Sequence, residues 1–198
     1  MATVVVPFRS TDPKSRLATL SERDRVRLAE AMLADVLDAA VPVGKLVVVS
    51  PQAPALPIGA MHVADPKRGQ GAAVESALDA AAAAGLPAPY LVINADLPCA
   101  TSRDLLALAG AVPDGGLALV AAADGTTNAL GLSTSVLFDP VYGPGSAERF
   151  AALGDSFRLD APNLADDVDT VEDLLRLGER LGEHTRRVLR ALQLETAA

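Results

Sequence analysis

The stretch Tyr90–Pro98, which reads YLVINADLP, decides the fold class. Its first four residues form a short apolar run, and the polar residues that follow include the carboxylate of Asp96. A short, continuous apolar run is typical of a strand buried on both faces of a parallel sheet. Because ligands bind at the carboxyl ends of the strands in open α/β sheets, Asp96 lies where we expect a functional site.

Similar apolar runs recur along the chain and alternate with helix-like segments. We expect strands at residues 3–8, 45–50, 60–63, 89–94 and 117–122, with weaker strands near 134–138 and 157–160. This alternation predicts an α/β protein with a mainly parallel, mixed sheet and helices on both faces.

The clearest helix is expected to begin at Ser21, whose side chain can accept a hydrogen bond from the amide of Asp24. Further helices are expected at 71–84, where Gly85 ends the helix, at 101–108, and over the tail 170–194 with a break near Gly182. The face of the first helix that we expect to be buried contains Val26, Ala29, Leu33, Val36 and Leu37.

Composition limits the function classes. The 198 residues contain 17 Lys and Arg against 25 Asp and Glu, a net charge of −8, and only 3% aromatic residues. We expect one domain, 1–198, with the helical tail as an appendage. An acidic chain with few aromatics is a poor partner for nucleic acid. No apolar run could span a membrane, and the lone Cys99 and the N-terminal residues favour a cytoplasmic protein without a signal peptide.

The loop after the first strand gathers three cations, Arg9, Lys14 and Arg16, in an otherwise acidic chain. Guanidinium and ammonium groups neutralise phosphate oxygens, so the loop could face a polyphosphate; a solvated connection is the alternative. The loop has no glycine, which disfavours the glycine-rich motifs of dinucleotide-binding and P-loop enzymes. A second stretch, Gly69-Gln70-Gly71, could let a nucleotide approach the backbone, or could simply begin a helix.

Carboxylates gather at two places in the sequence. Asp96 follows a central strand, and the stretch 166–170 places Asp167 and Asp169 on the same side of an extended chain. Hard oxygen ligands of this kind could hold a divalent cation that bridges phosphate oxygens. The alternatives are a turn at Asp96 and a helix N-terminus at Thr170.

Two loops of small residues, 124–130 and 142–146, could hold a second, smaller anion through hydroxyls and backbone amides. Ser146 could equally be the N-cap of a helix at 147–153. We assign His62 and His184 to structure or surface, because neither has a candidate nucleophile beside it.

Five motifs, taken in order, resemble one family: Pro7 to Leu17, Asn94–Pro98, Gly125–Leu130, Gly143–Ser146 and Asp167–Thr170. The family is that of the phosphoenolpyruvate and 2-phospho-L-lactate guanylyltransferases of coenzyme F420 biosynthesis. The resemblance extends roughly over residues 4–175. It implies a nucleotidyltransferase fold of the glycosyltransferase-A type, which is Rossmann-like, with GTP and Mg²⁺ as co-reactants.

The resemblance also implies roles for individual residues. Asp96, Asp167 and Asp169 match the carboxylates that hold the metal. Thr127, Gly143 and Ser146 match contacts to the phosphorylated three-carbon acid. The nucleotide would face Arg9, Gly69 and Gly71 together with Lys14 and Arg16, and the last two, with Asp96, would be catalytic. The chain departs from the usual pattern at residues 69–71, where other members read Gly-Leu-Asn, and at 125–128, where they read Gly-Gly-Thr-Asn.

The expected reaction joins GMP from GTP to phosphoenolpyruvate and releases pyrophosphate, with no covalent intermediate on the protein. The alternatives are the same reaction on 2-phospho-L-lactate, another nucleotidyltransferase of this fold that acts on a molybdenum cofactor or a sugar phosphate, and a non-catalytic nucleotide-binding module. The apolar positions of the tail could pack on the sheet or on a second copy in a homodimer.

Overall fold

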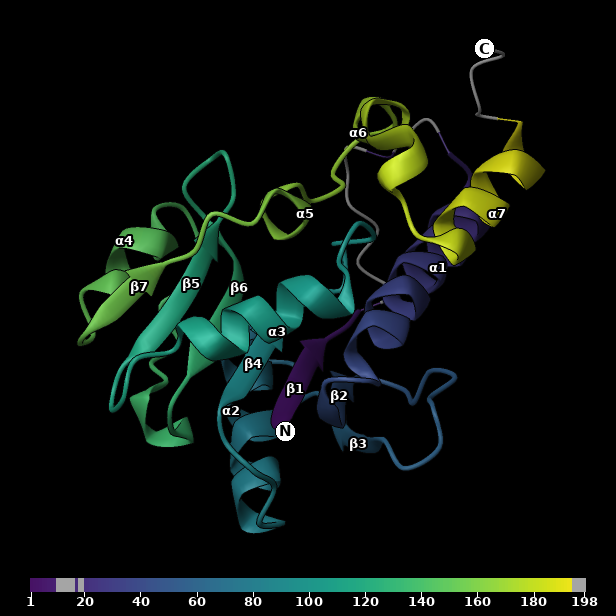
Figure 1. Ribbon diagram of the computed structural model, residues 1–198. Coiled ribbons are helices and arrows are strands. Elements are labelled where there is room, and N and C mark those ends of the chain that lie inside the picture. Colours follow the sequence, from purple (N-terminus) through teal and green to yellow (C-terminus); the bar gives the residue numbers. More distant parts are fainter. Residues whose placement is uncertain (10–16, 18–19, 194–198) are drawn as a thin grey trace.

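A computed structural model describes residues 1–9, 17 and 20–193, and contains one seven-stranded sheet in the order β3-β2-β1-β4-β6-β5-β7 (Figure 1). The strands are β1 (Ala2–Pro7), β2 (Gly44–Ser50), β3 (Met61–Ala64), β4 (Tyr90–Ile93), β5 (Leu117–Ala121), β6 (Thr127–Leu132) and β7 (Ser156–Arg158). The sheet confirms the mixed, mainly parallel architecture expected from the sequence.

One strand, β6, runs against its neighbours. It pairs antiparallel with both β4 and β5, whereas β1 is parallel to β2 and β4, and β5 is parallel to β7. Because Ile93, the last residue of β4, is opposite Ala129, the first residues of β6 lie at the edge where β4 ends. The backbone amide of Asn94 continues the pairing by donating to the carbonyl of Asn128 at 3.1 Å. Residues near 94 and 127 therefore share one edge of the sheet.

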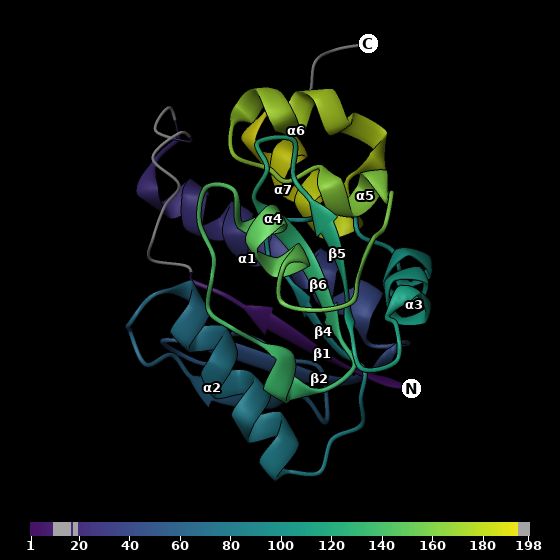
Figure 2. The ribbon, with the colours of Figure 1, turned by 90° about the vertical axis from the view of Figure 1, so that its left-hand side faces the viewer.

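Helices cover both faces of this sheet. They are α1 (Glu22–Ala40), α2 (Gln70–Ala83), α3 (Ser102–Ala111), α4 (Ser146–Ala151), α5 (Pro162–Ala165), α6 (Val171–Leu177) and α7 (Glu183–Leu192), with the 3₁₀ turns η2 (Ser135–Leu137) and η3 (Gly178–Arg180). Figure 2 shows α2 and α3 on opposite sides of the strands. None of these helices has the length and apolar character needed to cross a membrane.

The alternation of side chains along β1 divides the core into two. Val4 and Val6 pack with residues of α1 and α3 on one face, and Val5 packs with residues of α2 and α4 on the other. All three valines are fully buried, which a strand covered on both faces requires. The central strands thus read as continuous apolar runs because neither face meets water.

The strand expected near 134–138 is wrong. Residues 135–137 form η2, whose preceding Thr134 accepts a hydrogen bond from the amide of Val136. The strand in this part of the chain is β6, whose sequence TNALGL has few β-branched residues. Its Gly131 has no room for a Cβ, because the side chain of Val112 lies 2.6 Å from that position. Packing, rather than strand propensity, places β6 in the sheet.

The helix predictions are largely confirmed at their ends. Ser21 caps α1, Thr101 and Asp104 form a reciprocal capping box at α3, and Gly85 follows α2 with a positive φ of 67°. In α1 the buried face contains Leu33, Val36 and Leu37 as expected, but Val26 and Ala29 are only partly buried. Ser146 begins α4 as a helical residue, and Gly145 is the N-cap instead.

The helical tail packs against α1. Leu174, Leu177, Leu181 and Leu189 from the tail form a third apolar cluster with Leu28 and Met32 of α1. The break near Gly182 is confirmed, since α7 begins at Glu183. Asp35 of α1, which is only 6% exposed, accepts hydrogen bonds from the backbone amides of His184 and Thr185, both at 2.9 Å. A buried side chain of α1 therefore satisfies the free amides at the start of α7.

Candidate active site

The carboxylates expected to act together come from two segments that the structure brings side by side. The backbone amide of Val168 donates to the carbonyl of Asp96 at 3.1 Å. Asp167 and Asp169 flank Val168, so all three aspartates lie at the carboxyl edge of β4. Each of them is half-buried, whereas Val168 is fully buried and anchors its segment in the core beneath α6.

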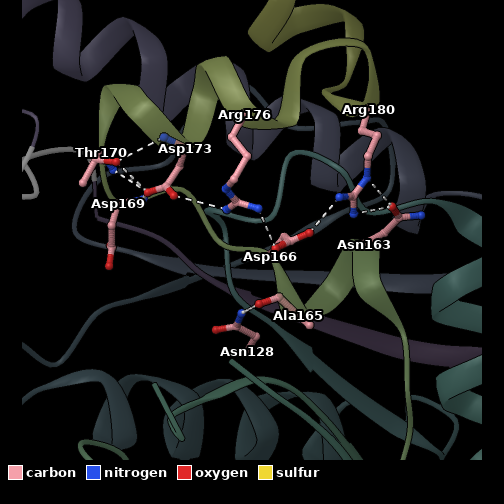
Figure 3. Close-up of polar contacts among 9 residues, drawn as sticks. All are labelled: Asn128, Asn163, Ala165, Asp166, Asp169, Thr170, Asp173, Arg176 and Arg180. Carbon is pink, nitrogen blue, oxygen red and sulfur yellow. Dashed lines mark hydrogen bonds and ion pairs between the residues drawn. The ribbon is translucent and has the colours of Figure 1, made fainter. Parts of the chain in front are cut away.

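Asp166 and Asp173 are engaged in structural contacts on α6 and η3 (Figure 3). Asp166 forms ion pairs with Arg176 at 3.0 Å and Arg180 at 2.7 Å. Burial alone would raise the pKa of Asp166, but the hydrogen bonds from these guanidinium groups outweigh it and hold the pKa below its usual value. Asp173 forms the reciprocal capping box with Thr170. The helix-cap interpretation of this acidic stretch is therefore confirmed for Thr170, and Asp166 serves as an acceptor for two arginines.

The three carboxylates are of the chemical type that binds a hard divalent cation. Carboxylate oxygens are the ligands that Mg²⁺ prefers, and Figure 3 shows the side chain of Asp169 directed away from Asp173 and the arginines. Within residues 1–9, 17 and 20–193, however, no three His, Cys, Asp or Glu side chains form a ready-made metal cluster. The backbone pairing brings the aspartates to one edge without closing them around a common centre.

A set of side-chain amides ties the surrounding loops to this edge. Gln70 Nε2 donates to Asn94 Oδ1 at 2.9 Å, and Asn94 Nδ2 donates to the carbonyl of Thr127 at 3.3 Å. Asn128, which is 3% exposed, donates to the carbonyl of Ala165 at 3.0 Å. The start of α2, the end of β4, the start of β6 and the segment before Asp166 are thus linked through amides.

Two hydroxyls expected to contact an anion lie together. Thr127 Oγ1 and Ser146 Oγ are 3.1 Å apart, and the residues are 3% and 0% exposed. A hydrogen bond between two hydroxyls uses one of their two hydrogens, so one donor remains for a further acceptor. The amide of Ala147 donates to the carbonyl of Gly125 at 3.2 Å, which fixes α4 against the turn before β6.

The loop that leads into Ser146 is braced by one side chain. Gly143 and Gly145 have φ values of 110° and 71°, which residues with a Cβ rarely adopt. Arg149 of α4 donates to the carbonyls of Val141, Tyr142 and Pro144 at 2.7 to 3.3 Å. The guanidinium group therefore holds this tight loop from its helical side.

Aromatic side chains lie next to the same loop. Tyr142 and Phe150 pack edge to face with ring centroids 5.1 Å apart, and Phe138 packs against both of them. Burial raises the pKa of the Tyr142 hydroxyl well above its usual value. These rings fix the position of the loop relative to the core on the α2 side.

The cations expected to face the nucleotide are only partly described. Lys14 and Arg16 lie outside the described residues. Arg9 forms a two-contact ion pair with Asp65, at 2.6 and 3.3 Å, and Asp65 also accepts from the amide of Lys67. Burial raises the pKa of Asp65, but the hydrogen bonds from Arg9 and Lys67 have the larger combined effect, so the pKa lies below its usual value.

The two glycines at the start of α2 differ in their surroundings. Gly69 has a φ of 99°, and nothing lies near its missing Cβ. At Gly71 a Cβ would lie 2.5 Å from the Cβ of Pro140, so this position has no room for a side chain. The loop that leads to Gly69 follows β3, and its first residue, Asp65, accepts a hydrogen bond from Arg9.

The remaining reactive side chains have structural roles. Burial raises the pKa of the Cys99 thiol to about 11, which leaves it protonated and unreactive near neutral pH. His62 hydrogen-bonds to Ser50, and His184 Nε2 lies 3.0 Å from Asp38 Oδ2. These contacts agree with the assignment of both histidines to structure or surface.

Sequence reasoning missed the amides of Gln70, Asn94 and Asn128 as a connected set. Isolated glutamine and asparagine residues carry no pattern, and their partners are up to 37 positions away. The sequence did contain one indication, because Asn94 directly follows an apolar run and Asn128 lies in a loop of small residues.

The family described as guanylyl transferase CofC like matches this chain over residues 2–197. The chain belongs to this family. It is therefore a nucleotidyltransferase of the guanylyltransferase kind. The resemblance drawn from the five motifs is confirmed.

Relatives in this family carry names for different acids. A phosphoenolpyruvate guanylyltransferase of Nocardia farcinica (strain IFM 10152) is 37% identical over 92% of this chain and 87% of the relative. A 3-phospho-D-glycerate guanylyltransferase of Phenylobacterium zucineum (strain HLK1) is 33% identical over 91% of each chain. A 2-phospho-L-lactate guanylyltransferase of Archaeoglobus fulgidus is 38% identical over 48% of this chain and 42% of the relative.

Solved structures agree on the fold. A crystal structure from Desulfovibrio desulfuricans G20, named for a nucleotide-diphospho-sugar transferase, superposes with a TM-score of 0.75 at 19% identity and covers 100% of both chains. At this identity the likeness shows the architecture alone. It confirms the nucleotidyltransferase fold that the family resemblance implies.

Proposed function

We propose that this guanylyltransferase transfers GMP from GTP to phosphoenolpyruvate. A phosphate oxygen of the acid attacks the α-phosphorus of GTP, and a phosphoanhydride bond forms. The bond between the α-phosphorus and the oxygen bridging to the β-phosphorus breaks, and pyrophosphate leaves with the electron pair. The attacking phosphate is ionised at neutral pH, so the reaction requires no general base.

The observation that carries the proposal is the pairing of Val168 with the carbonyl of Asp96. It brings three carboxylates to the edge of the sheet where Thr127 and Ser146 also lie. The reaction joins two polyanions, so charge neutralisation and alignment are the main catalytic requirements. Carboxylates that would hold a divalent cation, with hydroxyl donors on the same edge of the sheet, would meet those requirements.

Asp96, Asp167 and Asp169 are proposed to hold Mg²⁺. When bound, the cation supplies the positive charge that lets phosphate oxygens of the two substrates approach each other. Arg9, Lys14 and Arg16, with the backbone at Gly69 and Gly71, are proposed to bind the triphosphate and nucleoside. Arg9 would act mainly by fixing the loop after β3, because its guanidinium group is paired with Asp65.

Thr127, Gly143 and Ser146 are proposed to bind the phosphorylated acid. The hydroxyl pair has one hydrogen left to donate, and the loop that Arg149 braces leads directly into Ser146. We favour phosphoenolpyruvate as substrate because relatives named for it are 33% to 37% identical over most of the chain. The relative named for 3-phospho-D-glycerate also spans most of the chain, which makes that acid the second candidate.

The test is a direct comparison of acceptors. The protein, GTP and Mg²⁺ are incubated with phosphoenolpyruvate, 2-phospho-L-lactate or 3-phospho-D-glycerate, and pyrophosphate release is followed. We expect phosphoenolpyruvate to give the largest kcat/KM. A larger value for either other acid would reassign the substrate, and pyrophosphate release with no acid would point to simple hydrolysis. Binding of GTP without pyrophosphate release in any mixture would favour the non-catalytic alternative.

A further inference from the structure

The residue between Gly69 and Gly71 is distinguished by its contacts. Gln70 is the first residue of α2, is exposed, and lies at the carboxyl edge of the sheet. Its amide donates to Asn94, two residues before Asp96. A glutamine at the start of a helix would normally extend into solvent, but this one is held across the loop by a hydrogen bond.

The orientation of the Gln70 amide is fixed by its partners. The carbonyl of Thr127 can only accept, so the atom of Asn94 that faces it must be Nδ2. Asn94 therefore presents Oδ1 to Gln70, and Gln70 must present Nε2 in return. The Oε1 atom and the second N–H of Gln70 take no further hydrogen bond within the described part of the chain.

Neither position beside Gln70 carries a side chain that could take its place. Pro140 occupies the space that a Cβ at position 71 would need. At position 69 the positive φ of 99° disfavours any residue with a side chain. Nothing lies near the missing Cβ of Gly69, so the backbone there is open to a flat ligand, and Gln70 supplies the polar edge beside it.

We propose that Gln70 selects guanine by pairing with the lactam edge of the base. Oε1 accepts from N1–H, and the second N–H of the amide donates to O6. Adenine presents the opposite order, an acceptor at N1 and a donor at N6. A freely rotating amide would turn over to match either purine, but the hydrogen bond to Asn94 prevents this. This inference rests on the proposed function, which places the nucleotide at residues 69–71.

The experiment compares Gln70→Leu with the parent protein and with Gln52→Leu, a matched control at an exposed glutamine in the β2–β3 connection. Values of kcat/KM are measured for GTP, ITP and ATP with Mg²⁺ and phosphoenolpyruvate. ITP keeps the lactam edge but lacks the 2-amino group. The thermal midpoint of each variant is measured to check that these exposed substitutions leave the fold intact.

We expect Gln70→Leu to lower kcat/KM for GTP and ITP about tenfold and to leave kcat/KM for ATP unchanged. A tenfold loss is about the size expected for one exposed contact to a base. Gln52→Leu should change none of the three. An unchanged ratio of GTP to ATP in Gln70→Leu would overturn the assignment, and so would a loss for GTP that ITP does not share. Equilibrium binding of the same nucleotides gives the same ratios without turnover. If GTP binds with the expected ratio but no pyrophosphate forms, the proposed reaction fails and the assignment of Gln70 stands; if no nucleotide binds, both fail.

Discussion

Replacing Asp35 by alanine should destabilise the protein strongly, although this residue lies outside the site. Its carboxylate is 6% exposed and accepts from the amides of His184 and Thr185, both at 2.9 Å. Thr185 is fully buried, so water cannot readily replace the lost acceptor at its amide. The backbone of Gly182 packs directly on this carboxylate, so a residue with a Cβ at position 182 would collide with Asp35.

The loss of unfolding free energy follows from the number of backbone N–H groups that Asp35→Ala leaves without an acceptor. Each buried N–H without a partner costs about 1–3 kcal/mol. The amide of His184 can gain some solvent, so we place the total for Asp35→Ala at about 3 kcal/mol. In a domain of this size, that loss should lower the thermal midpoint by about 6–12 °C.

The control uses the neighbouring turn of the same helix. The carboxylate of Asp38 contacts Nε2 of His184, and the side chain of Asp38 is 71% exposed. Asp38→Ala should therefore cost less than about 1 kcal/mol. Urea denaturation followed by circular dichroism gives the free energy of unfolding of both variants. A cost for Asp35→Ala no larger than that for Asp38→Ala would refute the claim that the buried acceptor holds α7.

Further expectations concern the site and its supports. Asp96→Ala should lower pyrophosphate release about 1,000-fold or more, because it removes a ligand of the proposed cation that stabilises the developing negative charge. The exposed control Asp114→Ala should not lower it. Near-normal turnover of Asp96→Ala would remove Asp96 from the mechanism. Arg149→Ala should raise the KM for the acid about tenfold and leave the KM for GTP unchanged. Arg149→Lys should not restore the KM for the acid, because a compact ammonium group lacks the planar, spread donors with which Arg149 reaches three carbonyls. Equal changes in both KM values would contradict a role confined to the acid loop. Because the folded-state pKa of Asp166 lies below the ordinary 3.8, its contribution to stability is present above that value and lost as the pH falls through the lower folded pKa. Urea midpoints measured between pH 5 and 2 should therefore decline less for Arg180→Leu than for the parent; parallel curves would show that the pair adds nothing.

The sequence predicted the parts of the fold that local patterns encode. Apolar runs identify strands buried on both faces, and Ser21 and Thr101 identify helix starts because their side chains must satisfy free amides. The place of Asp96 followed from the same logic, since a polar residue after a buried strand can only lie at the sheet edge.

Other features depend on partners distant in the chain. The strand β6 has weak local signals, and it pairs because β4 and β5 leave a place between them. Asp35 resembles any exposed helical aspartate in the sequence, yet its partners lie 149 and 150 positions away. The brace from Arg149 and the amides around Asn94 are hidden for the same reason, because no spacing rule relates side chains to backbone groups of other elements.

The reversed direction of β6 has a consequence for how such an enzyme can diversify. In the proposed assignment, the residues that bind GTP follow β1 and lie at the start of α2. The residues that bind the acid lie on β6 and in the loop that leads into α4. The two sets meet along one seam, where β4 and β6 run in opposite directions. Mutations on the β6 side of that seam can change which acid binds while the GTP-binding side keeps its shape. New acids are therefore accessible without loss of nucleotide binding.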